Sequence, residues 1–255
     1  MIRLITVKPK NSDTKYDVGI ITLVSNFNYG NRLQAYATYM IYRTMGFNPV
    51  HLELSRRFIL KEELKMLLRK ALRMEIDDPE KLMTPMRLDA FGRFNSMMAS
   101  KLVKSTGESF LRKLSYVSIG SDQVWNPLYI INHEDWYMAD FMPSMQKIAL
   151  APSIGIADLN PEQMNWLASE LKNFQKVSVR EKRGAELIWE SSGVEAEVIC
   201  DPTMVLSAEE WRAAADGRCT PSDPYVFTYL LGGVGDEAAD ILDRVTDHGR
   251  IPVVP

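Results

Sequence analysis

The amino-acid sequence predicts an α/β protein with a Rossmann-like parallel sheet and flanking helices. Several short runs are mostly apolar and β-branched, which is typical of strands buried on both faces of a parallel sheet. Segments with apolar residues at helical spacing alternate with these runs, and glycine or proline marks many of the junctions. The strands expected on these grounds are residues 18–24, 50–54, 116–120, 147–151, 176–181 and 197–200.

The first expected strand begins a βαβ unit. A loop rich in turn-forming residues follows it at 25–31, and apolar residues then recur at helical spacing from Leu33 to Met45. Gly46 is expected to end this helix, and the strand at 50–54 comes soon after it. Strand, helix and strand in this order indicate two parallel strands joined by a crossover helix.

A second helix is expected at about residues 57–74, with leucines on one face and lysines and arginines mostly on the other. This pattern has two interpretations: a helix that touches an anionic membrane surface, or an amphipathic core helix with a solvated basic face. We favour the second, because most surface helices have such a pattern. Further helices are expected at residues 85–102, 161–173 and 182–191.

The last part of the chain indicates a second domain. Residues 212–224 contain proline, glycine and aspartate and are expected to form a linker. The elements expected after it are a strand at 225–231, a helix at 237–247 and the start of a strand at 251–254. These elements cannot bury a core by themselves. We therefore expect an N-terminal Rossmann-like domain at 1–211 and, at 225–255, the start of a truncated second Rossmann-like domain.

Composition excludes several classes of protein. The chain has 255 residues, 46% hydrophobic and 25% charged, which is typical of a globular and not a disordered chain. Its formal net charge is −3, whereas a nucleic-acid binder held by phosphate contacts is expected to be basic. No run approaches the roughly 18 apolar residues of a membrane helix, and the N-terminus lacks the apolar core of a signal peptide. With only two cysteines, Cys200 and Cys219, a reducing, cytoplasmic location is expected.

Four polar strings follow expected strands, at residues 25–31, 120–127, 152–155 and 180–181. In an open parallel sheet, ligands bind beyond the carboxyl ends of the strands. The convergence of four strings on one end of the sheet is stronger evidence for a site than any one of them.

The first string precedes a helix, whose N-terminal N–H groups favour an anion. Asn28 and Asn31 are suited to hydrogen bonds with sugar hydroxyls, and Gly30 lies between them. The alternative is an N-capped turn with Gly30 at positive φ. The glycine spacing is not that of a dinucleotide-binding loop.

The other strings each offer a chemical and a structural interpretation. Asp122 is either a general acid or base or the cap of a turn, and Trp125 either stacks on a sugar ring or packs under the loop as core. Arg180 either holds a phosphate or carboxylate by paired hydrogen bonds or forms an ion pair with a nearby carboxylate. The three histidines do not have metal-ligand spacing and no G-x-S-x-G elbow occurs, so neither a metal site nor a serine hydrolase is expected.

Together these strings resemble the motifs of the polysaccharide pyruvyl transferase family. They occur in the family's order over about residues 17–211, and the GSDQVWN string at 120–126 is the most specific of them. The matching strings are residues 17–21, 28–34, 120–126, 151–155, 178–181 and 201–203, with Trp211. The resemblance implies two Rossmann-like domains that face each other across a cleft, as in GT-B glycosyltransferases, with the C-terminal domain incomplete.

Characterised members of this family transfer a pyruvate ketal from phosphoenolpyruvate to a sugar. The resemblance therefore implies phosphoenolpyruvate as the donor substrate, no separate cofactor, and a glycan or lipid-linked sugar of a cell-surface or extracellular polysaccharide as the acceptor. It implies that Asp122 is the acid or base and that Arg180 contacts the donor anion. The residues that it implies for substrate binding are Asn28, Gly30, Asn31, Gln123, Trp125 and Ser153.

The family also carries an arginine and histidine motif in its C-terminal half, and the sequence ends before that region; His248 comes too early. An incomplete fragment that acts as a binding module is therefore one alternative function, and a GT-B-like glycosyltransferase using a nucleotide sugar is another. Two assemblies are open, a homo-oligomer or completion by another chain, because the strand at 225–231 would otherwise expose sheet edges. The basic helix at 57–74 is the segment that suggests peripheral membrane contact.

Overall fold

A computed structural model of the chain describes most of its residues. The described ranges are 16–23, 27–53, 83–99, 101–103, 108–111, 113–130, 134–143, 146–215, 222–229 and 234–254. The chain divides into two compact units, Met1–Leu206 and Ser207–Pro255. The helix predicted at 57–74 lies outside the described residues. Among the helices that are described, none is long and apolar enough to cross a membrane.

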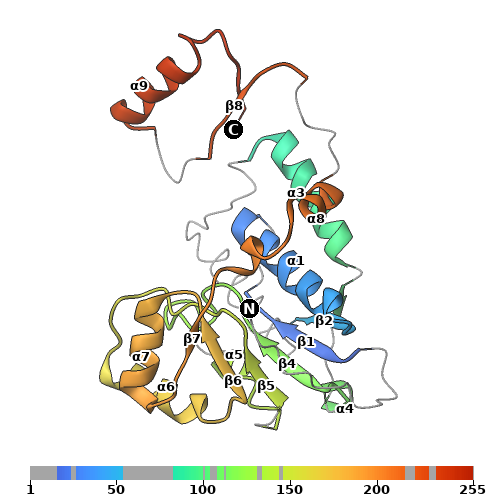
Figure 1. The fold of residues 1–255 in the computed structure, drawn as a ribbon, viewed down its shortest axis with the longest axis vertical. Helices are drawn as coiled ribbons and strands as arrows, with labels where there is room; N and C mark the ends of the chain where they lie inside the picture. Colours follow the sequence, from blue (N-terminus) through green and yellow to red (C-terminus); the bar gives the residue numbers. More distant parts are fainter. Residues whose placement is uncertain are drawn as a thin grey trace, which may run out of the picture. The chain divides into compact units, whose positions relative to one another are not determined.

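The first unit is built on a seven-stranded sheet in the order β3-β2-β1-β4-β5-β6-β7, and every neighbouring pair is parallel (Figure 1). The strands are β1 (Val18–Ile21), β2 (Pro49–Leu52), β3 (Leu102–Val103), β4 (Tyr116–Ile119), β5 (Lys147–Ala149), β6 (Lys176–Val179) and β7 (Glu197–Val198). This confirms the predicted α/β class with a parallel sheet. Each of the six expected strands is present but shorter than expected, and β3 was not expected.

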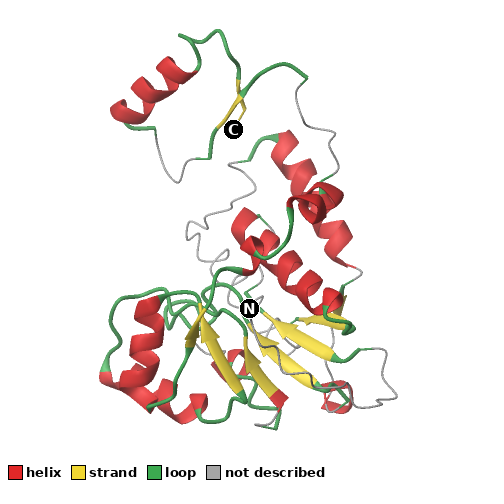
Figure 2. Ribbon diagram, viewed as in Figure 1, coloured by secondary structure: helices red, strands yellow, loops and turns green. Residues whose placement is uncertain are grey.

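Helices flank this sheet, and loops gather beyond the ends toward which the strand arrows point (Figure 2). The helical elements of the first unit are α1 (Tyr29–Thr44), α3 (Pro85–Ala99), α4 (Glu108–Leu111), α5 (Glu134–Tyr137), α6 (Pro161–Leu171), α7 (Lys182–Ser192) and the 3-10 helix η3 (Pro202–Met204). Figure 1 shows α6 and α7 side by side near β6 and β7, where they pack against each other.

Local sequence signals account for the ends of these helices. Asn160 and Gln163 form a capping box at the start of α6, directly before Pro161. Gly193 ends α7 in the left-handed conformation, with φ of 68°, which favours glycine. Pro161 and Gly193 were the sequence signals for these two helix ends, whereas the capping box was not predicted.

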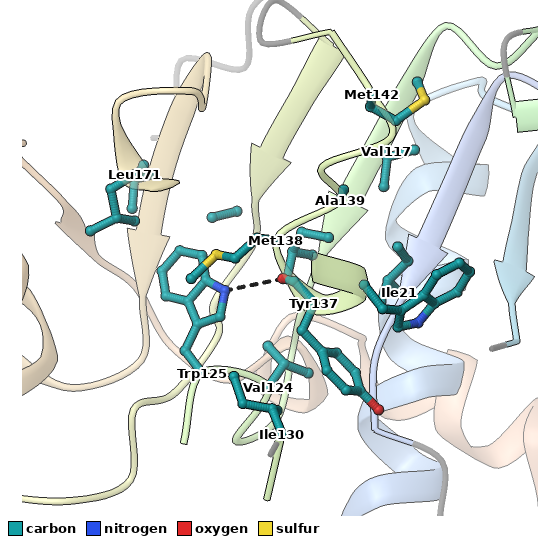
Figure 3. Packing of buried hydrophobic residues seen from close by; sticks show 14 of the residues in the cluster. Ile21, Val117, Val124, Trp125, Ile130, Tyr137, Met138, Ala139, Met142 and Leu171 are labelled. Carbon is teal, nitrogen blue, oxygen red and sulfur yellow. Dashed lines mark hydrogen bonds between the residues drawn. The ribbon is translucent and has the colours of Figure 1, made fainter. Parts of the chain in front are cut away.

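One hydrophobic cluster of the first unit joins the sheet to the segment that follows β4 and to helices α6 and α7. Figure 3 shows Trp125 from this segment packed among side chains that include Val124, Ile130, Met138 and Leu171. Trp125 is completely buried, and its indole Nε1 donates a hydrogen bond to the carbonyl oxygen of Tyr137 at 3.3 Å. The loop after β4 is thereby anchored in the core.

The second unit contains α8 (Ala208–Ala214), β8 (Val226–Phe227), α9 (Asp236–Val245) and β9 (Val253–Val254), and its two strands pair in parallel. The predicted linker at 212–224 begins inside α8. Ser207 and Glu210 form a capping box that starts this helix, and this S-x-x-E signal was overlooked in the sequence. The predicted domain boundary after residue 211 therefore falls within α8 and not at its end.

His51 on β2 is expected to make the first unit less stable in mild acid. The side chain is buried, with Nε2 3.1 Å from the carbonyl oxygen of Ala35, and burial lowers its pKa to about 4. An unfolded histidine titrates near 6.5, so protons bind the unfolded chain first as the pH falls. The stabilisation by neutral His51 is complete above pH 6.5, and about 2 kcal/mol of it should be lost by pH 5.

Urea unfolding at pH 7.5 and pH 5 measures this loss. In the His51→Gln variant the amide still reaches Ala35 but does not titrate, so the difference between the two pH values should shrink. An equal difference in both proteins would exclude His51 as its source.

Candidate functional site

The polar loops meet where the order of the sheet reverses. The chain runs outward from β1 to β2 and β3 on one side and continues from β4 to β7 on the other, so the switch point lies between β1 and β4. Ligands of such sheets bind beyond the carboxyl ends of the strands at this point. We refer to residues 27–32, 120–127, 152–155 and 180–181 as the carboxyl edge.

Asn31 connects α1 to the loop after β4. It is 3% exposed, and its Nδ2 donates to the carbonyl oxygen of Leu23 and to Oδ2 of Asp122, both at 2.7 Å. Its Oδ1 accepts from Arg32 Nη2 at 2.6 Å, and its backbone N–H is bonded to Asn28 Oδ1, which caps α1. The polar atoms of Asn31 therefore hold other groups of the site in place.

Asp122 is held in a defined position at the carboxyl edge. Its backbone has φ of 80°, a left-handed conformation that aspartate adopts more readily than most residues. Its Oδ1 accepts from the Gln123 N–H at 2.8 Å, and its carbonyl oxygen accepts from the Ser153 N–H at 2.8 Å. As a residue, Asp122 is partly exposed.

Two further groups lie within the electrostatic influence of Asp122. Burial lowers the pKa of the Arg32 guanidinium, and the negative charge of Asp122 acts in the opposite direction. Burial raises the pKa of Tyr137 to about 12, and Asp122 adds to that increase. Sequence reasoning did not single out either residue, because arginine in a helix is usually exposed and Tyr137 gives no local signal.

Arg180 extends from the end of β6. Its Nη1 donates to Oδ2 of Asp201, whose other oxygen accepts from the N–H and the hydroxyl of Thr203. Burial acts to raise the pKa of Asp201, but the hydrogen bonds from Thr203 and Arg180 outweigh it and hold the pKa below its ordinary value. Among the described residues, Nη1 is the one guanidinium nitrogen of Arg180 that is hydrogen-bonded to a side chain.

The loop after β5 lies between Asp122 and Arg180. Arg180 donates its backbone N–H to the carbonyl oxygen of Pro152 at 3.2 Å, and Pro152 forms a β-bridge with Asp122. Asp122 and Arg180, the two residues predicted as catalytic, therefore come from strands on either side of the same short segment.

Ser153 and Gln123 brace this loop. The hydroxyl of Ser153 donates to Oε1 of Glu181 at 2.8 Å, and Ser153 is buried. Oε1 of Gln123 accepts from Asn126 Nδ2 at 2.7 Å and lies close to Gly155, where a Cβ would approach it to 2.4 Å. The Ser153 hydroxyl and the Gln123 amide oxygen are therefore both hydrogen-bonded within the protein.

Two sequence interpretations require correction. Trp125 was predicted to contact the acceptor sugar, but its ring is completely buried and stands edge-on to Phe174, so it belongs to the core. Gly30 is not at positive φ, as the capped-turn alternative required; it lies in the first turn of α1 and is exposed. Asn28 is exposed at the carboxyl edge.

The fold is that of an open α/β protein with a parallel sheet, and polar loops lie at the carboxyl ends of its strands. The model of the polysaccharide pyruvyl transferase family matches residues 28–252, which is nearly the whole chain. The chain belongs to the polysaccharide pyruvyl transferase family. Comparisons with curated proteins and with solved structures gave no match.

Proposed function

We propose that this protein transfers a pyruvyl group from phosphoenolpyruvate to a sugar of a cell-surface or extracellular polysaccharide, forming a cyclic ketal. Family membership supports this reaction class, and one observation supports its assignment to a site. The backbones of Asp122 and Arg180 both contact the Pro152–Ser153 segment at the carboxyl edge, so a carboxylate and a guanidinium belong to residues on either side of one short segment. A cytoplasmic location is part of the proposal, because phosphoenolpyruvate is formed there.

The reaction sets clear chemical demands. Protonation of the methylene carbon of phosphoenolpyruvate makes its C2 electrophilic. One sugar hydroxyl attacks C2 and loses its proton, the bond from C2 to the phosphate oxygen breaks, and a second hydroxyl attacks C2 and loses its proton. The products are the ketal and inorganic phosphate, and no oxidant or reductant is needed.

The side chains of the carboxyl edge suit these demands. In this proposal Arg180 binds the carboxylate or phosphate of the donor, while Asp201 orients its guanidinium. Asp122 exchanges protons with the donor or the acceptor hydroxyls. Asn28 and Gln123 are the proposed contacts of the acceptor through their amide nitrogens, because their amide oxygens accept hydrogen bonds within the protein. Asn31 uses both amide atoms within the protein, and Ser153 donates its hydroxyl to Glu181.

Arg180→Ala is expected to lower sugar-dependent phosphate release from phosphoenolpyruvate by about 100-fold, as removal of one charge-assisted donor typically does. The matched control is Arg183→Ala on α7. The Arg183 side chain is more exposed than that of Arg180, and it pairs with Asp158, Glu186 and Glu190. Phosphate release is measured with a coupled colorimetric assay across a panel of sugars with neighbouring hydroxyls.

Two results would count against the proposal. Equal activity of Arg180→Ala and the wild type would remove Arg180 from the site. A thermal shift with a nucleotide sugar that phosphoenolpyruvate does not reproduce would favour a glycosyltransferase instead.

A further inference from the structure

We infer that Glu181 is a positioning residue that fixes the loop after β5, and with it the geometry between Asp122 and Arg180. One oxygen of its carboxylate, Oε1, accepts three hydrogen bonds from consecutive residues of that loop. The donors are the Ser153 hydroxyl at 2.8 Å, the Ile154 N–H at 2.8 Å and the Gly155 N–H at 3.3 Å. The effect on catalysis rests on the proposed function, whereas the effect on the loop does not.

The helix that Glu181 precedes does not explain this arrangement. Glu181 occupies the N-cap position of α7, but its side chain makes no capping hydrogen bond there. Glutamate is not among the preferred N-cap residues, which are serine, threonine, asparagine and aspartate. The side chain instead turns toward the neighbouring loop, and Gly184 leaves room for it, since a Cβ at that position would lie 3.3 Å from Oε1.

The loop held by Glu181 is fixed from its other side by the loop after β4. The Ser153 N–H donates to the Asp122 carbonyl oxygen at 2.8 Å, and the Ser153 carbonyl oxygen accepts from the Trp125 N–H at 3.2 Å. A continuous path of hydrogen bonds therefore runs from Asn31 through Asp122 and Ser153 to Glu181. Without the Glu181 carboxylate, the loop after β5 loses three hydrogen bonds. Asp122 and Arg180 both contact this loop, so their relative positions would become less fixed.

A positioning role and a direct chemical role for Glu181 predict different results for its amide variant. Glutamine presents an oxygen that accepts the same three hydrogen bonds, but it does not exchange a proton at neutral pH. Glu181→Gln should therefore keep the loop and the activity if Glu181 acts through the loop. It should keep the loop but lose the activity if the carboxylate reacts with substrate.

The first experiment measures amide hydrogen exchange of the full chain over residues 150–158, with no substrate present. We expect exchange at Ile154 and Gly155 to rise at least tenfold in Glu181→Ala and to stay within threefold of wild type in Glu181→Gln. Glu190→Ala is the matched control. Glu190 lies on α7, which Glu181 precedes, and among the described residues it pairs with Arg183 and not with the loop after β5. If Glu181→Ala does not fold, Glu181→Met replaces it, as a side chain of similar length without oxygen acceptors.

The second experiment measures phosphate release by the same variants. We expect kcat to fall at least tenfold in Glu181→Ala and to return to within threefold of wild type in Glu181→Gln. An inactive Glu181→Gln with a protected loop would overturn the inference in favour of a carboxylate that reacts with substrate. A protected loop in Glu181→Ala would also overturn it, because the loop would then be fixed without Glu181. If the wild type releases no phosphate, the proposed function fails, and the exchange rates alone decide whether Glu181 positions the loop.

Discussion

Asp122→Asn should lower sugar-dependent phosphate release by about 10²- to 10⁴-fold, the range typical of a lost general acid or base. The substitution removes the exchangeable carboxylate and changes little else in shape. The largest effect is expected at this position because Asp122 is a partly exposed acidic residue at the switch point, next to the loop that Arg180 also contacts.

The variant should remain folded, so that the loss can be assigned to chemistry. Asparagine tolerates the φ of 80° that Asp122 adopts. However, Asn31 Nδ2 and the Gln123 N–H both donate to the carboxylate, and an amide offers one oxygen in place of two. One unpaired donor costs about 1–3 kcal/mol, so the unfolding temperature should fall by a few degrees.

Asp158→Asn is the matched control for charge. Asp158 is exposed and pairs with Arg183 at 3.4 Å, away from the Asn31 and Gln123 contacts. This variant should retain wild-type activity. An Asp122→Asn protein that is folded and fully active would show that the proton is supplied by another group.

Most strands of the sheet were predictable because a strand buried on both faces is an apolar, β-branched run. This signal lies within the residues of the strand itself. β4 and β6 were found in this way. β3 was not, because two residues carry no periodicity and its position depends on pairing with His51 and Leu52 of β2. The start of α8 was missed although Ser207 and Glu210 gave a local signal for it.

The position of the polar loops at the carboxyl ends of the strands was predictable, but the contacts that their side chains make were not. A polar string after a strand indicates the carboxyl end of the sheet, but the hydrogen bond between Asn31 and Asp122 was not predicted. Nothing local indicates that Arg32 is buried or that Glu181 turns away from its own helix. Both depend on contacts between residues far apart in the chain, which periodicity and motif spacing do not contain.

Trp125→Ala should destabilise the first unit by about 3–5 kcal/mol, the usual cost of removing a large buried aromatic side chain. The ring is completely buried, and its loss also leaves the Tyr137 carbonyl oxygen without the indole donor. Since domains of this kind are stable by roughly 5–15 kcal/mol, much of the folding free energy depends on this one side chain. Chemical denaturation followed by circular dichroism measures the change.

Trp125→Phe separates the core interpretation from sugar binding. Phenylalanine can keep the edge-on contact with Phe174, where the centroids are 5.6 Å apart, but it lacks the N–H group that reaches Tyr137. The variant should therefore lose about 1–3 kcal/mol of stability while the KM for the acceptor sugar stays within twofold. If stability were unchanged and the acceptor KM rose tenfold, the ring would have to leave the core to meet the substrate. The loop after β4 would then be a moving part of the site and not a fixed support for Asp122.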